Sequence, residues 1–156
     1  MQLEYFQMID RVVEIDVGER RIRAVCTVPQ QSTVFEGHFP SYPLMPGVLL
    51  IECMAQTTGW LVSVIGGFAA MPILVGVKDA KFRSPVFPGS LLEFEGRVQH
   101  EGSGYAVGEC AGRQDGKVVC EADLTYRIMP YPTPQFRQVL FDWAERIDIA
   151  VKEFAK

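Results

Sequence analysis

A helix-length apolar stretch follows Pro46 and ends at the glycine pair Gly66-Gly67. Proline suits the first position of a helix, where its missing N–H costs nothing, and paired glycines tend to end one. The stretch therefore predicts a helix from Gly47 to about Ile65. Its apolar residues cover too wide an arc for a surface helix, so we expect a core helix that other elements surround. These residues are Val48, Leu49, Leu50, Ile51, Met54, Trp60, Leu61, Val62 and Ile65.

Apolar and polar residues alternate on both sides of this helix, which indicates half-buried strands. The apolar face of the first strand is expected to consist of Val13, Ile15 and Val17. Two strands, a buried helix and four further strands predict an α+β fold in which about six antiparallel strands wrap around the helix. One sheet covers only part of such a helix, so we expect a homodimer. The expected strands lie near residues 13–17, 22–28, 73–83, 92–99, 105–113 and 118–128, and the proline-rich residues 29–43 are expected to form a loop.

The chain divides at about residue 130. Residues 1–130 hold the predicted helix and strands, and residues 131–156 hold a proline-rich linker followed by apolar residues at helical spacing. This spacing predicts an amphipathic helix that packs on its own domain or on a neighbouring subunit. Its charges are balanced rather than basic, which argues against a membrane surface. The apolar positions are Phe136, Leu140, Trp143, Ile147, Ala150 or Val151, and Phe154.

Composition excludes several classes of protein. A formal net charge of −4 argues against nucleic-acid binding. The four cysteines form no CxxC pair and the histidines number two, so we expect reduced, partly buried thiols and no metal site. The first apolar stretch carries acidic residues, unlike a signal peptide, and the long apolar run is broken by Glu52 and Gln56, unlike a membrane span. The expected compartment is the cytoplasm.

One carboxylate, Glu52, lies inside the apolar helix, fourteen residues after His38. A buried charge is costly unless it is paired or used. A neutral histidine can act as a base, a carboxylic acid can act as an acid, and the Gly47 N–H at the helix N-terminus can stabilise an oxyanion. Gln56 lies one turn after Glu52 and could orient it. These groups suit removal of a proton beside a thioester carbonyl with loss of a β-hydroxyl, although spacing alone leaves a structural role for the pair open.

Two segments carry a family resemblance. GHFPSYPLMPGVLLIECMAQ (Gly37 to Gln56) closely resembles the signature of the 3-hydroxyacyl-ACP dehydratases of bacterial type II fatty acid synthesis, with GHFP, the MPG turn and the LIExMAQ helix in register. KFRSPVFPGSLL (Lys81 to Leu92) is similar to that family's strand after the helix, with Ser90 where an acid is usual. The resemblance spans roughly Tyr5 to Met129. It implies the hotdog fold, in which a sheet wraps around a helix.

The resemblance implies roles for individual residues in converting (3R)-hydroxyacyl-ACP to trans-2-enoyl-ACP. His38 would be the base at C2, Glu52 from the other subunit would act on the departing hydroxyl, and the Gly47 N–H would polarise the thioester carbonyl. Glutamate rather than aspartate at position 52 favours a FabZ-type dehydratase that does not isomerise its product. A hotdog acyl thioesterase and a non-catalytic acyl-ACP-binding subunit are the alternatives. The expected substrate-binding residues are Phe39, Pro46 and Gln56.

The implied partner is acyl carrier protein, which is acidic, and no metal or organic cofactor is expected. Basic residues should then lie at the tunnel mouth. The chain departs from the family pattern by lacking a short N-terminal helical segment and by adding the helix after Gln135. That helix could block or rebuild the interface of the family's common hexamer, a trimer of dimers, or line the acyl tunnel. The candidates for binding acyl carrier protein are Lys78, Lys81, Arg83 and Arg97.

Overall fold

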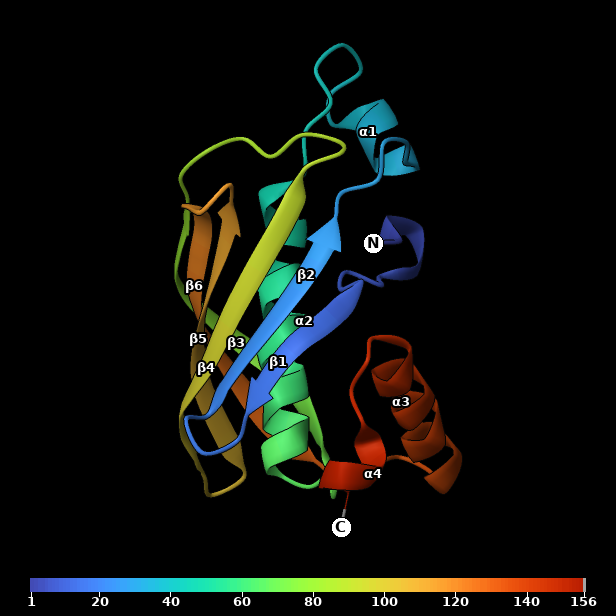
Figure 1. The fold of residues 1–156 in the computed structure, drawn as a ribbon, viewed down its shortest axis with the longest axis vertical. Helices are drawn as coiled ribbons and strands as arrows, with labels where there is room; N and C mark the ends of the chain where they lie inside the picture. The colour runs from blue at the N-terminus through green and yellow to red at the C-terminus, as the bar shows by residue number, and fades with distance from the viewer. Residues whose placement is uncertain (156) are drawn as a thin grey trace.

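The computed structural model, which describes residues 1–155, contains one six-stranded antiparallel sheet. The strand order is β1-β2-β4-β5-β6-β3, so β1 and β3 are the two edges (Figure 1). Each strand expected from the sequence overlaps one that is observed. The strands are β1 (Arg11–Asp16), β2 (Arg21–Thr27), β3 (Met71–Phe82), β4 (Leu91–Gly102), β5 (Tyr105–Gln114) and β6 (Lys117–Met129).

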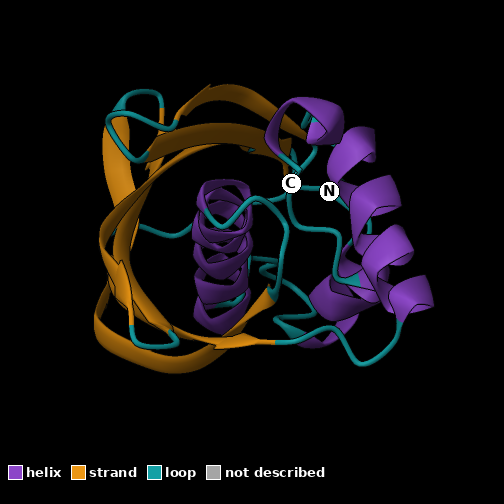
Figure 2. Cartoon of the chain, turned by 90° about the horizontal axis from the view of Figure 1, so that it is seen from below, coloured by secondary structure: helices purple, strands orange, loops and turns teal. Residues whose placement is uncertain are grey.

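The apolar helix α2 (Gly47–Ile65) lies inside the curve of this sheet. Figure 2, which looks nearly along α2, shows the strands curving around it and the other helices gathered on the side that the strands leave open. Pro46 is the N-cap of α2 rather than its first helical residue, because its ψ of 136° is extended. The predicted α+β hotdog arrangement, with a helix wrapped by six strands, is confirmed. Among residues 1–155, α2 is the one helix long and apolar enough to cross a membrane, and most of it is buried in the sheet.

The sheet approaches α2 closely at Thr58. A Cβ atom on Gly96 of β4 would lie 2.7 Å from the Thr58 Oγ1, and one on Gly108 of β5 would lie 2.8 Å from the Thr58 Cγ2. Real Cβ atoms essentially never approach so closely, so a side chain at either position would force Thr58 to move, and one at Gly108 would also meet the Arg97 carbonyl of β4 at 2.5 Å. Glycine at these two positions therefore sets how near the helix packs to the sheet.

Strand β1 buries a different residue from the one expected. Val12 is buried, whereas Val13 and Val17 are exposed. The register of β1 against β2 shifts between Val12 and Glu14, so one extra residue interrupts the alternation. Such a bulge moves each side chain after it to the other face of the strand. The apolar face expected from Val13, Ile15 and Val17 is therefore wrong at Val13 and Val17, whereas Ile15 is partly buried and packs against the core as expected.

A short helix, α1 (Thr33–Gly37), replaces part of the loop expected at residues 29–43. The Ser32 side chain caps it by accepting a hydrogen bond from the Val34 N–H. Ser32 Oγ and the Thr33 N–H both donate to the Glu4 carboxylate, at 2.7 and 3.0 Å. Glu4 belongs to a 3-10 helix, η1 (Leu3–Tyr5), so the expectation that no helical segment precedes the first strand is also wrong.

The tail forms two helices instead of one. Helix α3 (Pro134–Arg146) ends where Asp148 has a positive φ of 66°, and α4 (Val151–Phe154) follows. Figure 1 shows both, in red, beside β1. The Val12 N–H donates to the Ile147 carbonyl at 2.8 Å, and Ile149 is buried, so the break in the helix contacts the sheet of the same chain. Lys156, the last residue of the expected helix, lies outside the described residues.

Candidate active site

His38 follows α1 and is half-buried in the loop that leads to α2. Its Nδ1 lies 3.1 Å from the Leu44 carbonyl, and the Leu44 N–H donates back to the His38 carbonyl at 3.0 Å. A carbonyl oxygen only accepts hydrogen bonds, so Nδ1 must carry the hydrogen. In the neutral ring Nε2 is then the atom with the lone pair. The loop therefore holds the imidazole in the tautomer that can act as a base at Nε2.

The exposed Phe39 ring stacks on the His38 ring at 4.3 Å between centroids. The backbones of Phe39 and Tyr42 exchange hydrogen bonds of 3.3 and 2.9 Å, which close the turn between them. The imidazole is therefore fixed both by its backbone partner and by its neighbouring ring.

The N-terminus of α2 offers unpaired donors. Among residues 1–155, neither the Gly47 N–H nor the Val48 N–H donates to a protein acceptor, as is usual in the first turn of a helix. A Cβ atom on Gly47 would lie 3.1 Å from the Phe82 ring, so that ring rests against this end of the helix. Phe82 was not among the expected site residues. The signal that could have found it is the matching segment KFRSPVFPGSLL, whose second residue it is.

Glu52 and Gln56 form a second cluster. The Gln56 Nε2 donates to the Glu52 Oε1 at 2.9 Å and to the Phe6 carbonyl at 2.6 Å. The Gln56 Oε1 accepts the Met8 N–H at 3.2 Å. The N-terminal segment therefore holds the Gln56 amide, and Gln56 in turn holds the carboxylate. This is the orienting contact expected from the spacing of the two residues.

An apolar cavity of about 430 Å³ is lined by Glu52 and Gln56 together with the N-terminal segment, the start of β3 and α3. His38, Phe39, Pro46 and Gly47 are not among its lining residues. Within one chain, Glu52 and Gln56 therefore lie together at the cavity. His38 and Gly47 lie outside the cavity lining, in the loop before α2 and in its first turn.

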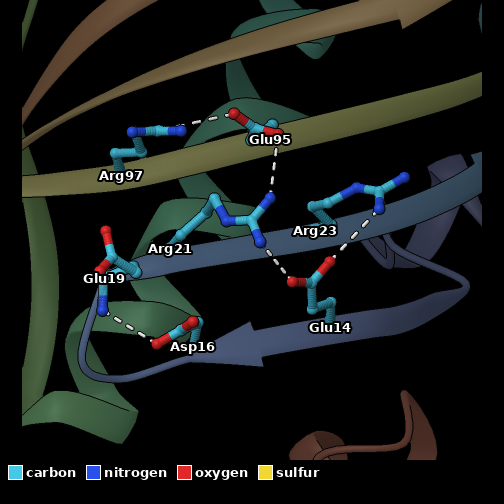
Figure 3. A network of polar contacts seen from close by, with 7 residues as sticks. All are labelled: Glu14, Asp16, Glu19, Arg21, Arg23, Glu95 and Arg97. Carbon is cyan, nitrogen blue, oxygen red and sulfur yellow. Dashed lines mark hydrogen bonds and ion pairs between the residues drawn. The ribbon is translucent and has the colours of Figure 1, made fainter.

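Three of the four basic residues expected to bind acyl carrier protein pair with acids on the sheet. Arg83 donates to Glu121 at 2.5 Å, and Lys81 lies 3.8 Å from the same carboxylate. Arg97 lies 3.5 Å from Glu95, at one end of a network that continues through Arg21 to β1 (Figure 3). Lys78 has no ion pair with any residue from 1 to 155.

Comparison with known proteins places this geometry in a family. Residues 1–123 match the FabA-like domain. The chain is 42% identical over 135 residues to the 3-hydroxyacyl-[acyl-carrier-protein] dehydratase FabZ of Granulibacter bethesdensis, covering 83% of this chain and 78% of that one. It is 37% identical over 131 residues to the FabZ of Symbiobacterium thermophilum, covering 83% and 92%. The chain belongs to the FabA-like family, as a dehydratase of the FabZ type. The resemblance inferred from the two FabZ-like segments is therefore confirmed.

Solved structures similar to this FabZ-type chain share its fold at low sequence identity. AziG from S. sahachiroi aligns with a TM-score of 0.65 at 14% identity, covering 83% of this chain and 96% of that one. The E. coli PaaI protein, from a phenylacetic acid degradation operon, aligns with a TM-score of 0.59 at 18% identity, covering 76% and 79%. At such identities the likeness concerns the hotdog fold alone.

Proposed function

We propose that this FabZ-type chain converts (3R)-hydroxyacyl-ACP to trans-2-enoyl-ACP in fatty acid synthesis. His38 Nε2 takes the proton from C2, the C3–O bond breaks, and Glu52 of the partner subunit gives a proton to the departing hydroxyl so that water leaves. The Gly47 N–H polarises the thioester carbonyl while negative charge builds on its oxygen.

The tautomer of His38 carries this proposal. In the neutral ring, the contact between its Nδ1 and the Leu44 carbonyl places the lone pair on Nε2, which is the arrangement that a base needs. The loop that carries His38 leads directly into α2, where the unpaired N–H of Gly47 has the positive end of the helix dipole behind it. A base and an oxyanion donor on one short segment suit proton removal beside a carbonyl.

A homodimer with sites shared between subunits is supported by the unpaired edge strand β3. Its side chains Ile73, Val75 and Val77 are 40%, 54% and 41% exposed, and an apolar edge of this kind tends to pair with another chain. Glu52 also lines a cavity that His38 of the same chain does not reach. Both observations favour a site that joins His38 of one subunit to Glu52 of the other.

Recognition of acyl carrier protein is proposed for the basic residues beside Phe82. Lys81 and Arg83 are the sequence neighbours of Phe82, and the Phe82 ring rests against Gly47, which carries the proposed oxyanion donor. Changing both to glutamate should raise the KM for hydroxyacyl-ACP at least about tenfold, because like charges would meet the acidic carrier. The KM for a small hydroxyacyl thioester without carrier protein should not move. Equal effects on both substrates would contradict this role.

A mixing experiment tests the shared site. Chains with His38→Ala and chains with Glu52→Gln are each expected to form inactive dimers. When the two are unfolded together and refolded, half of the dimers are mixed and each has one intact shared site, so about one quarter of wild-type activity should return. Formation of the enoyl thioester is followed by its ultraviolet absorbance, and release of free thiol would instead favour the thioesterase alternative. If mixing restores nothing while each variant remains dimeric, the two residues do not act across subunits.

A further inference from the structure

Helix α3 builds a wall of the cavity that starts at Glu52. It lies beyond residues 1–123, the part that matches the FabA-like domain. Its side chains Phe136, Leu140, Trp143 and Arg146 face the cavity, opposite residues of α2 and the start of β3. In Figure 2 the helix covers the side of α2 that the sheet leaves open. The added segment therefore changes the shape of a space that begins at a proposed catalytic carboxylate.

The α2 side of the cavity is one straight stripe. Glu52, Ala55, Gly59, Trp60 and Ser63 line it together with Gln56, at the three- and four-residue spacing of one helix face. From Glu52 to Ser63 the stripe rises through eleven residues, a length of about 16 Å. The small side chains on this stripe leave room for a narrow ligand that runs along the helix.

The walls suit a hydrocarbon chain. Among the described residues that line the cavity, only Glu52 and Arg146 carry a charge, and both tryptophans of the protein, Trp60 and Trp143, contribute to it. Its volume of about 430 Å³ lies within the range of small-molecule sites. An apolar space whose α2 stripe starts with a carboxylate matches a ligand whose reacting end is polar and whose remainder is apolar.

We propose that the distal part of the acyl chain occupies this cavity, and that Leu140 and Trp143 of α3 set the chain length that the enzyme accepts. This inference rests on the proposed dehydration, since it takes Glu52 as the end at which the reacting carbons lie. Helix α3 then determines which chain lengths are accepted, and residues 1–123, which match the family model, carry out the dehydration.

A matched pair of substitutions on α3 tests the inference. Leu140→Trp narrows the cavity, whereas Val139→Trp adds the same ring at the neighbouring exposed position, which does not line it. With Leu140→Trp, the ratio of kcat/KM for 3-hydroxydodecanoyl-ACP to that for 3-hydroxybutanoyl-ACP should fall at least about tenfold, as expected when apolar pocket volume is lost. With Val139→Trp the ratio should stay within about twofold of wild type. A wild-type ratio in the Leu140→Trp variant would overturn the inference while leaving dehydration intact.

A binding measurement tests the cavity without catalysis. The Trp60→Phe variant leaves Trp143 as the single tryptophan. Bromine quenches tryptophan fluorescence only at short range, so ω-bromoundecanoyl-ACP should give saturable quenching that unbrominated undecanoyl-ACP does not give. Absence of quenching under conditions where both acyl carriers bind would show that the chain lies elsewhere. Quenching in a protein that dehydrates no substrate would retain the cavity as an acyl site and reject the proposed function.

Discussion

The Nδ1 atom of His38 lies 3.1 Å from the carbonyl oxygen of Leu44, and this contact fixes which nitrogen of the ring is free to accept a proton. The loop supplies the contact through its backbone, so no second side chain is needed to orient the base. A substitution of Leu44 that preserves the backbone conformation of the loop should therefore preserve the tautomer of His38. The imidazole itself cannot be replaced without losing the base.

Replacing His38 by alanine should lower kcat for dehydration by about 100- to 10,000-fold, the usual contribution of a general base. The control is His100→Ala, which removes the other histidine, exposed near the end of β4. Activity is measured as enoyl thioester formed per dimer, and the thermal unfolding midpoint is measured alongside it. Comparable losses in the two variants would remove His38 from the mechanism.

Replacing Gln56 by leucine should lower kcat about tenfold or more, because Glu52 loses the amide that orients it. The Phe6 carbonyl and the Met8 N–H also lose their partner, which should lower the free energy of unfolding by about 1–3 kcal/mol. Urea unfolding and steady-state kinetics measure the two effects.

Gln99→Leu is the matched control for Gln56. It breaks a bond of the same length, 2.9 Å, to an exposed carboxylate, that of Glu109, away from the site. Neither kcat nor stability should change measurably in that variant. A Gln56→Leu enzyme with wild-type kcat and reduced stability would make Gln56 a purely structural residue.

Replacing Tyr126 by phenylalanine should lower the free energy of unfolding by about 1 kcal/mol. Burial raises the pKa of Tyr126 well above its usual value of 10.0, so the hydroxyl keeps its proton and donates to the Ala55 carbonyl at 2.8 Å. This bond ties β6 to α2. The exposed Tyr105, at the start of β5, provides the control, since Tyr105→Phe should leave the urea midpoint unchanged. An equal midpoint for wild type and Tyr126→Phe would argue that the bond contributes nothing net.

The Glu121 carboxyl should titrate below its usual pKa of 4.5. Its hydrogen bond from Arg83 is the main cause that lowers this pKa, and Lys81 adds to the effect. A pKa lowered by folding stabilises the protein above the usual value, and that contribution is lost as the pH falls through the folded-state pKa. The pKa is measured by NMR titration of the side-chain carboxyl. Arg83→Gln should raise it towards 4.5, whereas Arg97→Gln, which affects the pair with Glu95, should not.

Much of this fold follows from local patterns along the chain. The bounds of α2 agree with the sequence because an apolar stretch between a proline and two glycines has few other structures open to it. The strands agree because alternation with a period of two marks a half-buried surface. The proposed site residues His38, Gly47, Glu52 and Gln56 all come from one short segment of the sequence.

The expectations that proved wrong depended on contacts between distant parts of the chain. Helix α1 could not be predicted from its own residues, because the side chain of its capping residue Ser32 is held by Glu4, more than twenty residues earlier. The bulge after Val12 and the break in the tail meet in one hydrogen bond between the Val12 N–H and the Ile147 carbonyl. Neither segment contains a local signal for that pairing, because each contributes only a backbone group.

The sequence by itself determined the wrapped helix, the six strands and the segment that carries the proposed chemistry. Only the tertiary structure decided which nitrogen of His38 is free, since that depends on the position of the Leu44 carbonyl. It also decided that α3 covers the open side of α2 and extends a cavity from Glu52. An amphipathic pattern indicates that one face of a helix must be buried. The packing of the whole chain decides which surface that face contacts.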